Sequence, residues 1–152
     1  GLDFPILKAA VEVNAARQER MADQVMAAVD GVDDPVVALW GLAFKAGTDD
    51  TRESPALHIG ESLARRGAVV RAYDPEATAA DPIEMCESAL AATDGAHVLV
   101  VATEWPQFAE VDPTEVATVM RGDLVMDLRN LLDAEQIRAA GLRLQGIGKP
   151  SS

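Results

Sequence analysis

The sequence predicts an α/β fold in which a doubly wound, five-stranded parallel sheet follows a long N-terminal helix. Two observations predict this fold. Five short runs rich in Val, Leu and Ala recur between residues 36 and 145. Stretches with helix-start signals and helical spacing separate these runs from one another. Strict alternation of strands with helices is typical of a parallel sheet that helices cover on both faces.

The first predicted element is a helix from about Phe4 to Asp30. Pro5 is tolerated in a first helical turn, and no Gly follows until Gly31. Apolar side chains recur on one stripe at Leu7, Val11, Met21, Val25 and Val29. Such a helix is roughly 40 Å long at 1.5 Å per residue. Since a domain of this size cannot bury it alone, we expect the helix to mediate a homodimer.

The remaining elements follow in strict alternation. Strands are predicted at Val36 to Leu42, Val69 to Tyr73, His97 to Ala102, Leu124 to Met126 and Leu142 to Gln145. Helices are predicted from the Ser54 cap to about Arg66, from Ser88 to Thr93, from Asp112 to Met120 and from the Asp133 cap to Ala140. The stretch from Ile83 to Met85 is expected to be irregular. The order of these elements predicts a Rossmann-like fold.

Composition limits the possible partners. The 152 residues suit one domain, and 25 acidic against 13 basic residues leave a net charge of −12. We expect such a surface to repel nucleic acid and anionic membranes, whereas an anionic nucleotide could bind where the local field is positive. A single cysteine excludes an internal disulfide. No apolar run reaches the ~18 residues of a membrane span, so a cytoplasmic setting is expected. The start without Met indicates a piece of a longer protein.

The loop after the first strand is the strongest candidate site. It carries Lys45 and Arg52 as cations together with the adjacent carboxylates Asp49 and Asp50. In an open α/β sheet, ligands bind at this carboxyl edge. Lys45 could pair with a phosphate or a sugar oxygen, or it could be a solvated loop lysine. Arg52 alone would most often pair with the neighbouring carboxylates.

Other polar residues end strands at the same edge. Arg129 follows the fourth strand, so it could converge with the first loop, or it could be a surface arginine. Asp74 ends the second strand, where it could bind a ribose or form a turn with Pro75. The run Thr103-Glu104-Trp105 ends the third strand, and we expect Trp105 to pack. The sequence assigns this run no chemical role.

Several kinds of chemistry are not predicted. There is no Gly-x-Gly-x-x-Gly motif, so NAD is not expected on a phosphate loop of the usual type. Glu84 and Glu87 flank Cys86 and should raise the pKa of its thiol, which argues against a nucleophile. His58 and His97 lack the spacing of metal ligands. We therefore predict no catalytic residue and no metal ligand.

The first loop resembles that of one family. Gly41-Leu42-Ala43-Phe44-Lys45, followed by Thr48-Asp49-Asp50 and Arg52-Glu53-Ser54-Pro55, is similar to the opening loop of the C-terminal domain of UDP-glucose/GDP-mannose dehydrogenases. The resemblance implies that Phe44, Lys45 and Arg129 contact a UDP-sugar. It also implies that Arg52 reaches an NAD bound mainly by an N-terminal domain.

The resemblance extends over nearly the whole chain. It implies that residues 1–31 are the C-terminal part of a central dimerisation helix and that residues 32–152 are the UDP-sugar-binding domain. Family members oxidise the C6 hydroxyl of a nucleotide sugar to a carboxylate in two NAD-dependent steps, through a cysteine that precedes the central helix. We therefore expect this chain alone to be inactive. UDP-glucose is the expected substrate, and GDP-mannose or an N-acetylated UDP-hexosamine are alternatives.

Two other functions remain as alternatives. A receiver-like binding module would also have a five-stranded doubly wound sheet, but it needs an Asp at the end of the third strand. Here that strand ends in Val101-Ala102-Thr103-Glu104. A structural dimerisation domain would bind no nucleotide.

Overall fold

The computed structural model describes residues 5–43, 54–79 and 82–146, with side chains from residue 16 onward. One sheet contains the strands β1 (Val36–Trp40), β2 (Val69–Tyr73), β3 (Glu84–Met85), β4 (Val98–Val101), β5 (Leu124–Asp127) and β6 (Arg143–Gly146). The strands lie in the order β3-β2-β1-β4-β5-β6, and all neighbours are parallel. This six-strand order is that of the Rossmann sheet, and the five longer strands numbered among themselves have the order 2-1-3-4-5, which a receiver-type sheet shares.

The prediction of five strands was one too low. Strand β3 forms inside the stretch that was expected to be irregular. It pairs with β2 through Arg71 opposite Glu84 and Ala72 opposite Met85. Two residues are too few to show a periodic pattern, so the sequence alone does not predict this strand. It forms because it pairs with the edge of β2.

The helices lie where the sequence predicts them, with one addition. They are α1 (Pro5–Ala28), α2 (Pro55–Arg65), α3 (Ala89–Thr93), α4 (Pro106–Ala109), α5 (Pro113–Val119) and α6 (Ala134–Ala139). The single turn α4 was not predicted. Side-chain oxygens of Ser54, Ser88, Asp112 and Asp133 accept backbone N–H groups at the starts of α2, α3, α5 and α6. These caps explain why each of these helices begins where it does.

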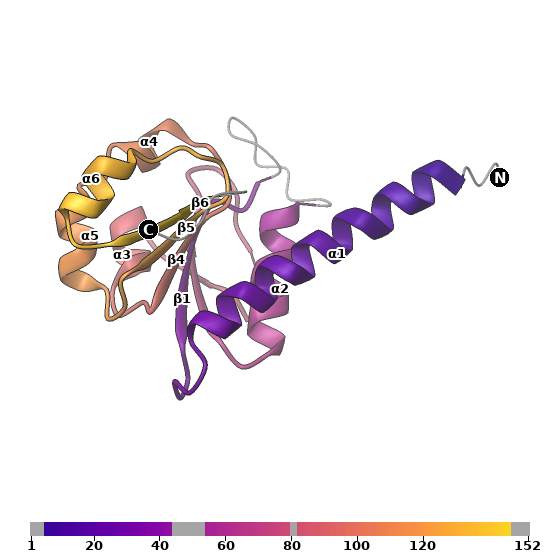
Figure 1. Ribbon diagram of the computed structural model, residues 1–152, viewed down its shortest axis with the longest axis horizontal. Helices are drawn as coiled ribbons and strands as arrows, with labels where there is room; N and C mark the ends of the chain where they lie inside the picture. Colours follow the sequence, from indigo (N-terminus) through magenta and orange to yellow (C-terminus); the bar gives the residue numbers. More distant parts are fainter. Residues whose placement is uncertain (1–4, 44–53, 80–81, 147–152) are drawn as a thin grey trace.

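Two apolar layers enclose the sheet (Figure 1). On one face, α1 and α2 pack their apolar side chains against strand residues such as Leu39 and Val100. On the other face, α3, α5 and α6 cover Trp40 and Leu99. The large side chain of Trp40 is buried on this second face. Its ring packs against Phe108 at a centroid distance of 5.2 Å, and its indole N–H donates to the Ala89 carbonyl at 2.9 Å.

Helix α1 is joined to the domain only along its C-terminal part. In Figure 1, its N-terminal half projects away from the sheet, whereas its last turns lie beside α2. Ala22, Val25 and Val29 are buried in the core there. Next to them, the Glu19 carboxylate pairs with the Arg66 guanidinium at 2.6 Å and with His58 Nε2 at 3.0 Å. Among the described residues, no helix is long and apolar enough to span a membrane.

Candidate functional site

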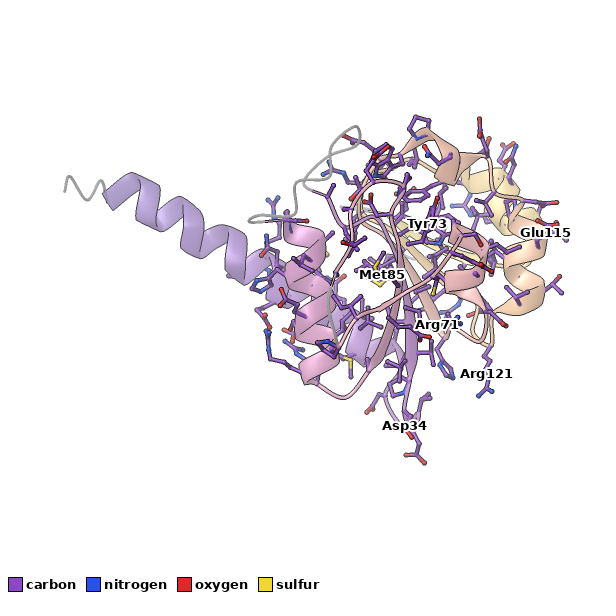
Figure 2. The ribbon with its side chains drawn as sticks, turned by 180° about the vertical axis from the view of Figure 1, so that it is seen from behind. Asp34, Arg71, Tyr73, Met85, Glu115 and Arg121 are labelled. Carbon is purple, nitrogen blue, oxygen red and sulfur yellow. The ribbon has the colours of Figure 1, made fainter. Side chains whose placement is uncertain are left out.

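The candidate site lies at the carboxyl edge of the sheet, beside the point where the strand order reverses. That reversal falls between β1 and β4, the place where open α/β sheets bind ligands. Figure 2 marks the two ends of the strands: Asp34 lies at the amino end of the sheet and Tyr73 toward the carboxyl end. The segments that leave β1, β2 and β4 at the carboxyl end bring Ala43, Asp74 and Thr103 together.

Gly41 allows the β4 segment to approach the end of β1. Its φ is +100°, and a Cβ at this position would overlap the Thr103 side chain. The Thr103 hydroxyl donates to the Ala43 carbonyl at 3.1 Å, and the Thr103 side chain is fully buried. Thr103 therefore packs directly against the backbone of Gly41, which leaves no space for a side chain at position 41.

Asp74 is the most extensively bonded polar residue at this edge. Its Oδ2 accepts the backbone N–H groups of Leu42 and Ala43 at 2.8 and 3.1 Å and the indole N–H of Trp105 at 3.2 Å. Its Oδ1 accepts the N–H groups of Glu76 and Ala77, each at 2.8 Å. A carboxylate offers about four acceptor sites, so five donors leave none for a ribose. The geometry argues against the ribose-binding interpretation, and the Oδ1 bonds form the turn after β2.

The described ends of the first loop lie close together. The Ser54 hydroxyl donates to the Leu42 carbonyl at 2.6 Å and caps α2 by accepting the Leu57 N–H at 3.4 Å. The predicted site residues Phe44, Lys45 and Arg52 lie outside the described residues. Their roles remain predictions, although the chain enters and leaves their segment at the carboxyl edge.

Arg129 is held at the same edge by a buried carboxylate. Asp127 is 1% exposed, and its two oxygens accept the N–H groups of Arg129 at 3.1 Å and Leu132 at 2.7 Å. Asn130 follows with a φ of 55° and completes the turn. The Arg129 guanidinium lies 3.3 Å from a Glu104 carboxylate oxygen. The loops after β4 and β5 therefore converge.

This ion pair leaves Arg129 able to bind a ligand. The Arg129 side chain is 34% exposed and the Glu104 side chain 51% exposed. A guanidinium has five N–H donors, so one carboxylate partner does not exhaust it. Arg129 is therefore the described cation that best suits a phosphate at this edge.

The remaining candidates have structural roles. Partial burial raises the pKa of the Cys86 thiol, Glu84 and Glu87 add to this, and Arg71 opposes it. The expected direction is confirmed, although burial is the main cause. His97 Nδ1 accepts the Val36 N–H at 3.0 Å, and His58 pairs with Glu19. Within the described part of the chain, no three His, Cys, Asp or Glu residues are grouped to hold a metal ion.

Two features of the candidate site were not predicted from the sequence. The bonds from Asp74 to the β1 segment and the pairing of Glu104 with Arg129 both depend on which strands are neighbours. An Asp at the very end of a strand followed by Pro, as in Asp74-Pro75, was the available signal for the first. Nothing local indicated the partner of Glu104.

Comparison with known proteins places the chain in one family. Residues 38–134 match the model of the UDP-glucose/GDP-mannose dehydrogenase family, UDP binding domain. The chain is 40% identical to a UDP-glucose 6-dehydrogenase of Pseudomonas aeruginosa, covering 99% of this chain and 36% of that protein. It is 32% identical to UDP-glucose 6-dehydrogenase TuaD of Bacillus subtilis, covering 99% and 34%. The chain thus spans about a third of the length of these curated relatives.

Solved structures show the same fold. A UDP-D-ManNAc dehydrogenase from Pyrococcus horikoshii superposes with a TM-score of 0.78 at 30% identity, over 97% of this chain and 34% of that one. A UDP-glucose dehydrogenase from Pyrobaculum islandicum superposes with a TM-score of 0.74 at 28% identity, over 94% and 32%. The chain belongs to the UDP-glucose/GDP-mannose dehydrogenase family and carries the UDP-binding domain of that family.

Proposed function

We propose that the carboxyl edge of this sheet binds a UDP-sugar through Phe44, Lys45 and Arg129. The observation that carries the proposal is the placement of Arg129 at this edge, on a turn that the buried Asp127 holds, within the family's UDP-binding domain. An arginine fork suits the paired oxygens of a diphosphate. Lys45 would add a second cation in a chain that is otherwise strongly acidic.

We further propose that the whole protein is an NAD-dependent dehydrogenase that converts UDP-glucose to UDP-glucuronate. The relatives at 32 to 40% identity named above are UDP-glucose 6-dehydrogenases, which supports this substrate over GDP-mannose and N-acetylated UDP-hexosamines. Oxidation of the C6 alcohol to a carboxylate passes two hydrides to two NAD molecules and takes up one water. Arg52 would face the NAD, which binds mainly outside this chain. Residues 1–31 would form part of a dimerisation helix, and residues 32–152 would form the sugar-nucleotide domain.

Calorimetric titration of the chain with UDP-glucose, UDP and GDP tests the binding site. Lys45→Ala and Arg129→Ala should each weaken UDP-glucose binding by about tenfold to a hundredfold, because each removes a charge-assisted contact. Arg52→Ala should change the affinity little and serves as the matched control. The chain alone should produce no NADH from UDP-glucose and NAD.

Each alternative predicts a different result. Tighter binding of GDP than of UDP would contradict the proposed substrate. A damaging Arg52→Ala together with a silent Lys45→Ala would reverse the assignment of the two cations. Failure of the chain to bind any of the three nucleotides would favour a structural dimerisation domain.

A further inference from the structure

We infer that Asp74 is a positioning residue for the sugar-nucleotide site, acting through the backbone of Leu42 and Ala43. The inference rests on the proposed function, because it assigns Asp74 the task of directing the chain into Phe44 and Lys45. Asp74 touches no ligand in this role, since its carboxylate is used by protein donors.

Ala43 is fixed on both of its peptide groups. Its N–H donates to Asp74 Oδ2, and its carbonyl accepts the hydroxyl of Thr103. The preceding residue, Leu42, is fixed in the same way by Asp74 and by Ser54. Four consecutive backbone groups therefore have side-chain partners that come from three separate segments. These bonds set the direction in which the chain leaves β1, immediately before the two predicted substrate residues.

Local turn formation does not account for this arrangement. The Oδ1 bonds to Glu76 and Ala77 suffice for a turn after β2, because they span only two and three residues. The Oδ2 bonds span 31 and 32 residues and reach the β1 segment and Trp105. Trp105 directly follows Glu104, the partner of Arg129. One buried oxygen thus links the segment that precedes Lys45 with the segment that carries Glu104, the partner of Arg129.

The arrangement requires a carboxylate at position 74. All five groups that face it are N–H donors, and Asp74 is 6% exposed. An asparagine has the same shape, but its amide NH₂ would face N–H donors in either orientation. Asp74→Asn should therefore release one of the two sets of bonds. UDP-glucose binding should then weaken, because the backbone of Leu42 and Ala43 is no longer held in place before the ligand binds.

The 152-residue chain allows a direct test with Asp74→Asn and Thr103→Val. The valine keeps the packing against Gly41 but cannot donate to Ala43. Calorimetry should give about tenfold weaker UDP-glucose binding for Asp74→Asn and a smaller loss for Thr103→Val. The matched control is Asp112→Asn, whose amide oxygen can still accept the Thr114 N–H at the start of α5 and which should leave the affinity unchanged.

A spectroscopic measurement separates positioning from a general loss of stability. In ¹⁵N-tryptophan-labelled protein, Asp74→Asn should shift the indole N–H signal of Trp105. The signal of Trp40, which donates to Ala89, should stay in place. Affinities are measured well below the melting temperature of each variant, so a loss of stability alone would not change them.

The outcomes distinguish this inference from the proposed function. If the unaltered chain does not bind UDP-glucose, or if Lys45→Ala has no effect, the proposed function fails and the inference fails with it. If Lys45→Ala weakens binding while Asp74→Asn and Thr103→Val bind as the unaltered chain does, only the positioning role is overturned. If Asp74→Asn does not fold, Thr103→Val decides between the two results.

Discussion

Glu104 competes with an anionic ligand for the Arg129 guanidinium at this edge, because the two side chains form an ion pair. The two groups are 3.3 Å apart and both are partly exposed, so the pair is worth less than about 1 kcal/mol. A diphosphate that binds Arg129 has to share the guanidinium with Glu104 or displace it. Glu104 also places a negative charge close to the proposed position of the ligand.

Replacement of Glu104 should therefore tighten nucleotide binding. Glu104→Gln keeps the size of the side chain and removes its charge. We expect UDP-glucose to bind roughly two- to fivefold more tightly, a gain within the range of one exposed ion pair. Glu110→Gln removes the same charge from an exposed position on the neighbouring segment and controls for net charge. Weaker binding by Glu104→Gln would show that the carboxylate itself contacts the ligand.

The close contact between Thr103 and Gly41 can be tested through the free energy of unfolding of a Gly41 variant. Gly41→Ala should lower the free energy of unfolding by at least about 3 kcal/mol, because it adds a clash to an unfavourable positive φ. Gly67 is the matched control, since its φ is +101° and an added Cβ would meet nothing within 4 Å. Gly67→Ala should lose only about 1–2 kcal/mol. Equal losses in urea unfolding would contradict the close contact.

At the scale of whole elements, the sequence predicted the helices and strands that local residue patterns determine. Strands such as β1 and β4 are apolar along their length because both faces of the sheet are covered, and Ser and Asp caps mark the helix starts. The short elements β3 and α4 were missed. Each is too short to carry a periodic signal and forms only against neighbouring structure.

The candidate site shows the same division between local and long-range information. The position of Arg129 at the carboxyl edge follows from its place after a strand. The bonds of Asp74 require β1, β2 and β4 to be close in space, which no local pattern specifies. The specific roles of Phe44, Lys45 and Arg52 came from the family resemblance, and these three residues lie outside the described residues.

The contact between α1 and α2 should weaken in acid. The hydrogen bond from Arg66, followed by that from His58, lowers the pKa of Glu19 below its ordinary value of 4.5. A carboxyl with a lowered folded pKa contributes stability above its unfolded value, and this contribution is lost as the pH falls through the folded value. The ionic contribution of Glu19 should thus be fully present above pH 4.5 and decrease as the pH falls below that value.

Comparison with a neutral variant isolates this contribution. Urea unfolding of the unaltered chain and of Glu19→Gln should differ at pH 6 and converge as the pH falls below 4.5. Added salt should also reduce the difference, because the pair is exposed to solvent. An equal difference at pH 3 and pH 6 would contradict the ionic role.

For the whole molecule, we propose a homodimer through α1. The N-terminal half of this helix projects from the domain (Figure 1), and the sequence places Leu7 and Val11 on its apolar stripe. Light scattering at tens of micromolar should give a dimer, since an interface with a micromolar Kd is populated there. Leu7→Glu with Val11→Glu should give a monomer, whereas Lys8→Glu, off the stripe, should not. A monomeric unaltered chain would contradict the proposal.

The two outer strands limit the other ways in which copies of this chain could associate. Strand β3 has only two residues, follows Pro82, which has no N–H to donate, and carries the exposed Glu84. At the opposite edge, β6 begins with Arg143, which is paired to Asp123 at 2.9 Å. Short, charged or proline-flanked edge strands are poor templates for adding a strand from another molecule. The sheet is thereby protected from edge-to-edge growth, so fibrous aggregation through its borders is disfavoured even at high protein concentration.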